Sequence, residues 1–210
     1  MIEVWYIRHG ESEANAGQAT ETPEAIGLTK LGKEQADKVS IAFEKVPNLI
    51  ITSKYKRAIQ TAQPTAQRFR DIAVETWPVH EFTYLSPAKL GNTTQQERKP
   101  LSQAYWEKCD PAFIHGEGAE SFERFISRVK NLQEQIINTD NKFVAVFCHG
   151  FVIKTLLWAN LLGTFKTSSE YMRNFYSFHN SFDFPNCGII KAEYQFAKKL
   201  YSGIITDHLN

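Results

Sequence analysis

Cysteine is scarce in this sequence, and net charge is nearly absent. The three cysteines, Cys109, Cys148 and Cys187, are widely spaced and form no Cys-x-x-Cys pair. This spacing argues against a disulfide framework and against a zinc knuckle. The formal net charge is +1, from 24 basic and 23 acidic residues. No long-range field would gather nucleic acid or an anionic membrane, so an anionic ligand must be bound by a few convergent groups.

Long hydrophobic runs are also missing. The most apolar segment, FVIKTLLWANLLG at 151–163, is interrupted by Lys154. It falls well short of the roughly 20 residues of a membrane-spanning helix and therefore predicts a core helix. The N-terminus reaches Arg8 too soon for the apolar region of a signal peptide. The default expectation is a cytoplasmic protein with no membrane partner.

The chain has the length and composition of an ordinary globular protein. It has 210 residues, of which 42% are hydrophobic and 22% are charged. This is enough for one sizeable core, so we expect a single domain over 1–210. No internal repeat, low-complexity tract or linker divides it.

Short β-branched and aromatic runs alternate with helical patterns along the chain. The runs at 3–7, 48–52, 142–148 and 187–194 predict buried strands, and 74–77 is also strand-like. A helical stripe at 28–46 contains Ala36, Val39, Phe43 and Val46, and a second helix is expected at 121–137. This alternation predicts an α/β fold with a largely parallel sheet.

The segment 82–118 contains no clear strand and is rich in aromatic residues, proline and glycine. It predicts a lid-like insertion over the main body, because long excursions of this kind are often lids or binding loops. We expect one helix around 95–109, broken near Pro100 because proline lacks the backbone N–H.

Two predicted strands end in a histidine that glycine follows. YIRHG presents Arg8 and His9, and VFCHG presents His149. The carboxyl ends of parallel strands face one crevice, and glycine would let the backbone turn sharply there. Taken singly, each pair also fits an ordinary polar turn or a core histidine with satisfied hydrogen bonds.

A cation follows the second predicted strand. In TSKYKRAIQTAQ, Ser53 stands at the strand end and Arg57 lies about one turn into the next helix. A guanidinium there would reach the same sheet edge as His9 and His149, and its fork suits a tetrahedral oxyanion. In isolation, a solvated helix start is the alternative.

Together these motifs resemble a known family. RHGES with a following asparagine, GLTKLGKEQA, SKYKRAIQTA, GAESFERFISRV and VFCHG occur in the order seen in the histidine phosphatase superfamily, the phosphoglycerate mutase-like fold. The resemblance extends from residue 4 to about 190. It implies a three-layer sandwich, with helices on both faces of a mostly parallel central sheet.

The resemblance also implies roles for individual residues. His9 would be the nucleophile that forms a phosphohistidine. Arg8, Arg57 and His149 would surround the phosphoryl oxygens. Neighbouring cations are expected to lower the pKa of His9 and favour its neutral form. Ser12 and Asn15 would contact the phosphate, and Asn186 would hold backbone near the site. This chemistry needs no metal and no cofactor.

Three carboxylates compete for the role of general acid. Glu81 follows the strand-like run 74–77, directly before the insertion, where the phosphatases and mutases of the superfamily carry their acid. Glu120 suits a capping or structural role. Glu11 lies within RHGES, where a supporting role fits. We favour Glu81.

The chain lacks a stretch resembling the RHYGxLxGLNK of cofactor-dependent mutases, and it also lacks the GxWEG type of sequence found in many small phosphatases of the superfamily. A phosphatase acting on a small-molecule phosphomonoester is favoured. A mutase-like phosphotransferase and a noncatalytic phosphate-binding module remain alternatives, as does a phosphoprotein phosphatase. A second copy of the chain, forming a homodimer, is a candidate partner.

The insertion supplies candidates for substrate contacts. Aromatic side chains could form walls or could simply pack the insertion onto the sheet. These are Phe82, Tyr84, Tyr105, Trp106 and Phe113. Lys89, Arg98 and Lys99 are candidates for a second anion contact, and His115 is a candidate pocket residue.

Overall fold

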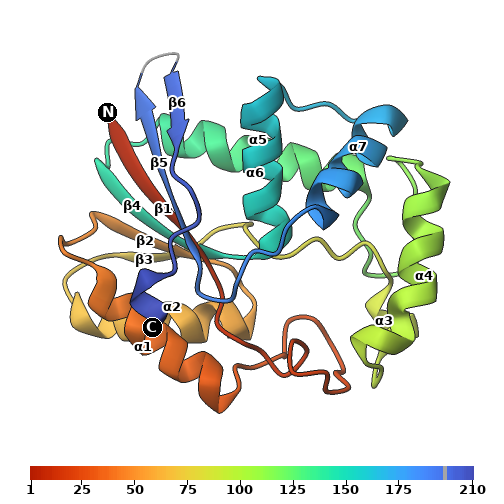
Figure 1. Cartoon of the computed structure of the whole chain (residues 1–210), viewed down its shortest axis with the longest axis horizontal. Helices are drawn as coiled ribbons and strands as arrows, with labels where there is room; N and C mark the ends of the chain where they lie inside the picture. Colours follow the sequence, from red (N-terminus) through yellow and green to blue (C-terminus); the bar gives the residue numbers. More distant parts are fainter. Residues whose placement is uncertain (196–197) are drawn as a thin grey trace.

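The computed structural model describes residues 1–195 and 198–210 and centres on a six-stranded sheet (Figure 1). The strand order is β3-β2-β4-β1-β5-β6. In that order the strands span Val74–Thr76, Leu49–Thr52, Phe143–Cys148, Ile2–Arg8, Ile189–Gln195 and Lys198–Tyr201. The first four strands run parallel, whereas β5 is antiparallel to β1 and β6 is antiparallel to β5. The prediction of a mostly parallel sheet is confirmed.

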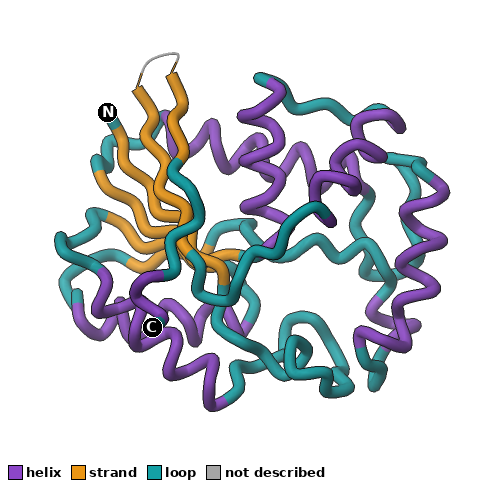
Figure 2. Tube along the Cα trace, viewed as in Figure 1, coloured by secondary structure: helices purple, strands orange, loops and turns teal. Residues whose placement is uncertain are grey.

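Helices cover both faces of this sheet, which makes three layers (Figure 2). The helices are α1 (Lys30–Ala42), α2 (Lys56–Arg68), α3 (Pro87–Leu90), α4 (Gln95–Lys108), α5 (Phe122–Ile137), α6 (Gly150–Leu162) and α7 (Ser169–Asn180). Because side chains alternate along a strand, Trp5 and Ile7 face α1 and α2, whereas Val4 and Tyr6 face the α5 and α6 side. The predicted α/β sandwich is confirmed.

Two local expectations are wrong. Val46 was expected on the buried stripe of the first helix, yet it is 55% exposed. The helix α1 ends at Ala42 and Phe43 is already extended, so helical spacing no longer applies at position 46. The helix α4 continues through Pro100 without a break. Proline removes one backbone donor there, while a capping box of Thr94 and Glu97 stabilises the start of the helix.

The segment 82–118 carries α3 and α4 and is attached by stacked aromatic rings. Phe82 stacks on Phe125 of α5, with ring centroids 4.5 Å apart. Trp106 of α4 stacks on Tyr176 of α7, with centroids 4.4 Å apart. The segment therefore shares the core on the α5 and α7 side of the sheet.

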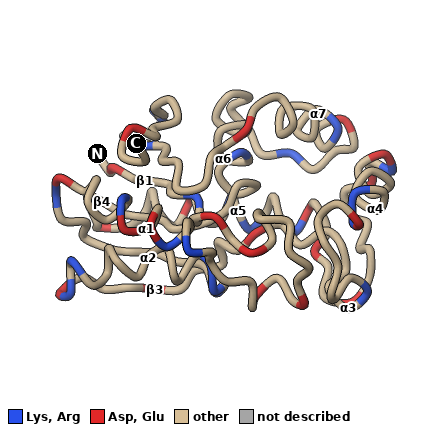
Figure 3. Tube along the Cα trace, turned by 60° about the horizontal axis from the view of Figure 1, so that its bottom comes forward, with Lys and Arg blue, Asp and Glu red and all other residues tan. Residues whose placement is uncertain are grey.

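Charged residues of both signs are interspersed along the chain (Figure 3). This distribution agrees with the formal net charge of +1. Among the described helices, none has the length and apolar character needed to cross a lipid bilayer.

Candidate active site

A cleft of about 870 Å³ lies at the carboxyl ends of the parallel strands. On one side it is lined by the predicted residues Arg8, His9, Ser12, Asn15, Arg57 and Glu81. On the other side the segment 82–118 supplies Phe82, Tyr84 and part of α4. The strand-end motifs thus converge as expected for a parallel sheet.

His9 follows β1 directly and is only 4% exposed. Its Nδ1 lies 2.7 Å from the carbonyl oxygen of Gly10. Because a carbonyl only accepts, Nδ1 must donate, and Nε2 therefore carries the free lone pair. Burial, together with the charges of Arg57 and Arg8, holds the pKa of His9 well below its usual value. The imidazole is neutral near pH 7, with Nε2 as its nucleophilic atom.

His149 follows β4 and caps the start of α6, and its ring centroid is 5.1 Å from that of His9. The Nε2 atom lies 2.8 Å from Ser53 Oγ, which also accepts a hydrogen bond from Tyr55 N at 3.0 Å. Ser53 Oγ either donates its proton to Nε2, which places the ring proton on Nδ1, or accepts from Nε2–H with its second lone pair. Nδ1 is buried and has no partner within the described residues, and His149 lies behind His9, outside the residues that line the cleft.

Arg8 and Arg57 share one arrangement. Arg8 Nη1 donates a hydrogen bond to the carbonyl of Phe184. Arg57 Nη1 donates to the carbonyl of Pro23 at 2.7 Å. Arg8 Nε is buried without a partner in the described part of the chain. Its Nε and Nη2 edge is thus left for a bidentate contact with an oxyanion. The Arg57 guanidinium also lies over the Tyr55 ring, 4.8 Å from the centroid.

Glu81 lies in the loop between β3 and α3, and its carboxyl group reaches the first turn of α6. Its carboxyl group accepts hydrogen bonds from Phe82 N at 3.0 Å and from Phe151 N at 3.2 Å. Burial raises the pKa of Glu81 above its usual value, and the nearby charge of Arg57 opposes part of that rise. A carboxyl group with a raised pKa beside a phosphate cradle can donate a proton to a leaving oxygen.

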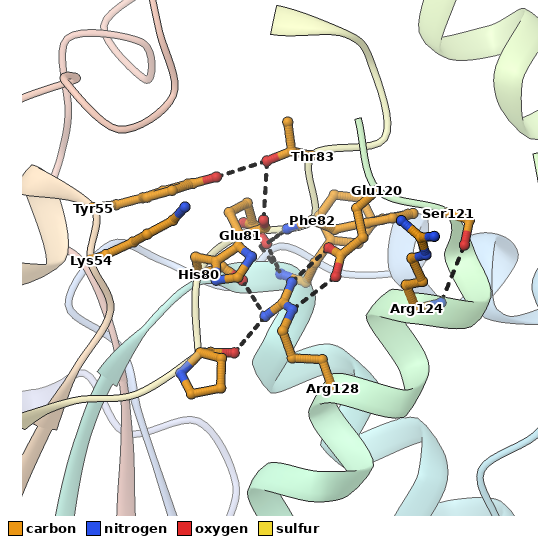
Figure 4. A network of polar contacts seen from close by, with 12 residues as sticks. Lys54, Tyr55, His80, Glu81, Phe82, Thr83, Glu120, Ser121, Arg124 and Arg128 are labelled. Atoms are coloured by element: carbon orange, nitrogen blue, oxygen red, sulfur yellow. Dashed lines mark hydrogen bonds and ion pairs between the residues drawn. The ribbon is translucent and has the colours of Figure 1, made fainter. Parts of the chain in front are cut away.

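A polar network holds the loop that carries Glu81 (Figure 4). Arg128 of α5 donates to the carbonyls of Pro78 at 2.8 Å and His80 at 2.9 Å. The same guanidinium binds both carboxylate oxygens of Glu120, at 2.9 and 2.7 Å. Glu120 therefore anchors Arg128, which agrees with the structural role expected from its sequence position.

Glu11 also lies outside the cleft lining. Its carboxylate accepts a hydrogen bond from Thr29 Oγ1 at 2.7 Å, next to the start of α1. Of the three candidate carboxylates, Glu81 alone lines the cleft.

The Ser12 hydroxyl donates to Asn15, whereas Asn15 keeps a donor for a ligand. Asn15 Oδ1 accepts from Ser12 Oγ at 3.0 Å and from Asn186 Nδ2 at 3.1 Å. These contacts orient the Asn15 side chain and leave its Nδ2 as the group available to a phosphate. Asn186 also donates to the carbonyl of His9 at 3.0 Å, so it holds backbone at the site as expected.

The glycine that follows His9 is needed for space and not for a sharp turn. Neither Gly10 nor Gly150 has a positive φ. A Cβ at Gly10 would lie 2.4 Å from the carbonyl oxygen of Gly32. The expectation of a glycine-dependent turn is wrong at both positions: close packing against the start of α1 is the constraint at Gly10, and a Cβ at Gly150 would lie 3.8 Å from its nearest neighbour.

The candidates in segment 82–118 divide into two groups. Phe82 and Tyr84 line the cleft. Tyr105, Trp106 and Phe113 do not; the first two are buried, and Trp106 joins α4 to the core. For these three the packing alternative is the correct one.

The proposed second anion contacts are mostly engaged elsewhere. Arg98 lines the cleft but donates to Thr20 Oγ1 at 3.2 Å and to the carbonyls of Thr93 at 3.0 Å and Thr94 at 3.1 Å. Lys89 donates to the carbonyl of His115 at 3.2 Å and lies outside the lining. Lys99 lines the cleft and is exposed.

His115 does not line the cleft. Its Nδ1 accepts from Ser86 N at 3.2 Å, so it joins two parts of segment 82–118. The expectation of a pocket role for His115 is wrong, because its ring is occupied by that internal contact.

The lining also includes residues that the sequence did not single out as site residues, among them Lys154, His179, Asp183 and Phe184. A signal existed for Lys154, because it interrupts an otherwise apolar helix five residues after His149. The others come from α7 and the loop after it, which no motif indicated.

The family model of the histidine phosphatase superfamily (branch 1) matches residues 4–196, and the chain belongs to this family. The adenosylcobalamin/alpha-ribazole phosphatase of Escherichia coli K12 is 27% identical over 177 residues, covering 77% of this chain and 80% of that protein. The alpha-ribazole phosphatase of Shigella flexneri has a similar fold, with a TM-score of 0.74 at 20% identity over 97% of this chain and 96% of its own.

A second solved structure extends the same comparison. The phosphoserine phosphatase of Entamoeba histolytica, in complex with 3-phosphoglyceric acid, gives a TM-score of 0.73 at 22% identity, with both chains fully covered. These likenesses establish the fold, and the resemblance inferred from the sequence is confirmed at the level of the family.

Proposed function

We propose that this chain is a metal-independent phosphomonoesterase. It acts on a small-molecule phosphomonoester through a phosphohistidine on His9, with Glu81 as general acid. The observation that carries the proposal is the buried neutral His9, whose Nδ1 donates to Gly10 so that Nε2 is free in a cleft lined by Arg8, Arg57 and Glu81.

In the first step His9 Nε2 attacks phosphorus and forms the P–N bond while the ester P–O bond breaks. The electron pair of the broken bond stays on the leaving oxygen, which takes the proton of Glu81 and departs as an alcohol. Arg8, Arg57, His149 and Asn15 Nδ2 stabilise the charge on the equatorial oxygens.

In the second step a water molecule attacks the phosphohistidine. Glu81, now a carboxylate, accepts the proton of that water, the P–N bond breaks and inorganic phosphate leaves. His9 returns to its neutral form and Glu81 to its protonated form, so the cycle closes without a cofactor.

The substrate body would occupy the part of the cleft beyond the phosphate groups. Apolar and neutral polar side chains predominate there, including Ile26, Leu85, Leu90, Gln95 and Gln96. Arg98 is bound to three oxygens of the chain itself, and Lys99 beside it is exposed to solvent, so an ion pair with a second anionic group would contribute little. The substrate is therefore a phosphomonoester whose body is neutral or weakly charged.

The test is release of inorganic phosphate from a panel of phosphomonoesters in the presence of EDTA. The intact chain is compared with His9→Ala, and thermal unfolding checks that both are folded. We expect turnover in EDTA that falls on the order of 10⁴-fold or more in His9→Ala. Activity that survives in His9→Ala would overturn the phosphohistidine mechanism.

The alternatives give different results in the same assay. A mutase-like phosphotransferase would transfer phosphate to an added acceptor alcohol faster than to water. A noncatalytic module would bind inorganic phosphate and release none from any panel member.

A further inference from the structure

Lys154 is a buried cation of the cleft that the mechanism above does not use. It lies on α6, lines the cleft and is 5% exposed. No carboxylate lies within ion-pair distance of it in the part of the chain that the structure describes. A buried ammonium without an ionic partner is unfavourable, so the contacts that Lys154 does make indicate its role.

Those contacts are two backbone carbonyls. Lys154 Nζ donates to the carbonyl of His179 and to that of Phe182, each at 2.6 Å. His179 is in the last turn of α7, where a cation interacts favourably with free carbonyls. Nζ also lies 4.5 Å from the centroid of the Phe182 ring. Lys154 therefore holds the end of α7 and the start of the segment that follows it.

The same segment orients Arg8. Two residues after Phe182, the carbonyl of Phe184 accepts a hydrogen bond from Arg8 Nη1. The backbone of Arg8 is held by Gly188 O at 3.1 Å and Cys187 N at 3.1 Å. The sheet therefore fixes where the side chain of Arg8 begins, and the Phe184 carbonyl fixes which edge of its guanidinium faces the cleft.

We propose that Lys154 is a positioning residue for Arg8. By holding segment 182–184 from one end, it keeps the Phe184 carbonyl where it binds Nη1 and leaves the Nε and Nη2 edge for the phosphoryl oxygens. The inference rests on the proposed function in assuming that a phosphoryl group occupies the cleft.

The first test is Lys154→Met, which keeps the length of the side chain and removes the donor. We expect kcat/KM to fall about 10- to 100-fold, since a displaced catalytic group carries losses of that size. The affinity for inorganic phosphate, measured by calorimetry, should fall in parallel. Lys154→Arg should restore most of both, and Lys154→Gln serves if Lys154→Met does not fold.

Lys191→Met is the matched control. Lys191 lies over the Trp5 ring, with Nζ 4.2 Å from its centroid, and is outside the cleft lining. It should retain the wild-type kcat/KM and phosphate affinity. A loss in Lys191→Met equal to that in Lys154→Met would mean that removing any lysine with a packed stem has this effect, and would overturn the inference.

A double-mutant cycle separates positioning from a general structural effect. In an Arg8→Met background the further change Lys154→Met should alter kcat/KM by no more than about twofold, because the residue it acts through is gone. Losses that multiply fully in the double variant would overturn the inference.

Failure of the inference and failure of the proposed function give different results. A wild-type chain that hydrolyses nothing, yet loses phosphate affinity on Arg8→Met and on Lys154→Met, contradicts the phosphatase and supports the positioning role. An active wild type whose Lys154→Met variant behaves like Lys191→Met supports the phosphatase and overturns the positioning role.

Discussion

The phosphate end of the cleft and the segment 82–118 that faces it are built on opposite plans. At the phosphate end, four side chains each have one nitrogen bound to the protein and at least one further nitrogen with no partner among the described residues. His9 is bound through Nδ1 and His149 through Nε2, while Arg8 and Arg57 are bound through Nη1. In the segment 82–118, Arg98, Lys89 and His115 use their polar atoms on neighbouring backbone and side chains.

This difference separates the residues that act on the phosphate from the segment that shapes the cleft. Side chains at the phosphate end are anchored to the ends of parallel strands, so their free atoms are held in place before a ligand arrives. The segment 82–118 is held by aromatic stacking and mainly contributes a wall. Substitutions at the phosphate end should therefore lower catalysis strongly. Substitutions in the segment 82–118 should lower stability or have little effect.

After His9→Ala, the largest effect is expected for Glu81→Gln. Loss of the general acid should lower kcat about 10²- to 10⁴-fold for alkyl phosphates. The loss should be much smaller for p-nitrophenyl phosphate, whose leaving group needs little protonation. Equal losses on both substrates would contradict the role of Glu81 as the proton donor.

The pH dependence of activity tests the protonation states proposed for His9 and Glu81. Activity should fall at low pH as His9 becomes protonated, which happens only below its lowered pKa. Activity should fall at high pH as Glu81 loses its proton, above its raised pKa. In profiles of kcat/KM against pH, the alkaline fall should be weaker or absent in Glu81→Gln. The ionisation of the substrate phosphate is the same for the wild type and for this variant, so it serves as the internal reference. An unchanged alkaline fall would exclude Glu81 as its source.

A smaller but still catalytic effect is expected for Arg57→Lys. The charge remains, but the fork and the contact with the Pro23 carbonyl are lost. One charge-assisted hydrogen bond is worth about 1.5–3 kcal/mol, which corresponds to roughly a 10- to 150-fold loss in kcat/KM. Steady-state kinetics with vanadate inhibition measure it, and unchanged vanadate affinity would contradict a phosphate contact.

Trp106→Leu tests the other half of the comparison. The indole is buried against Tyr176 and Phe151, so truncation should lower the free energy of unfolding by about 2–4 kcal/mol. Denaturant unfolding measures this. At a temperature where the variant is folded, kcat should change far less than in Arg57→Lys, and a comparable kcat loss would break the division between chemistry and shape.

The smallest effects are expected for Arg98→Ala and Lys99→Ala. Arg98→Ala removes contacts to Thr20 and the start of α4, and should lower the free energy of unfolding by about 1 kcal/mol. Neither variant should change the ratio of activity on a bisphosphate to that on the matched monophosphate by more than about twofold. A large fall in that ratio would restore them as second anion contacts.

Much of the fold could be predicted from local patterns. Buried strands at 3–7, 48–52 and 142–148 could be placed because continuous apolar runs flanked by polar turns are typical of a parallel sheet. The exposure of Val46 and the course of α4 through Pro100 could not be predicted in this way. The extent of a helix depends on caps and packing more than on periodicity.

The arrangement of the cleft could also be predicted from the sequence only in part. That His9, His149 and Arg57 meet at one sheet edge follows from strand ends in the sequence. That Glu81 and not Glu120 lines the cleft was favoured by sequence position, but the structural reason is the pairing of Glu120 with Arg128, eight residues further along.

By itself, the sequence determined which chemical groups are present and that the strand ends carrying them share one edge, because those properties depend on residue type and short-range periodicity. Only the tertiary structure decided which atom of each group is free, where the aromatic rings of 82–118 go, and how Lys154 reaches the segment that orients Arg8. Those outcomes depend on hydrogen bonds between residues as far apart as Arg8 and Phe184, which no local pattern encodes.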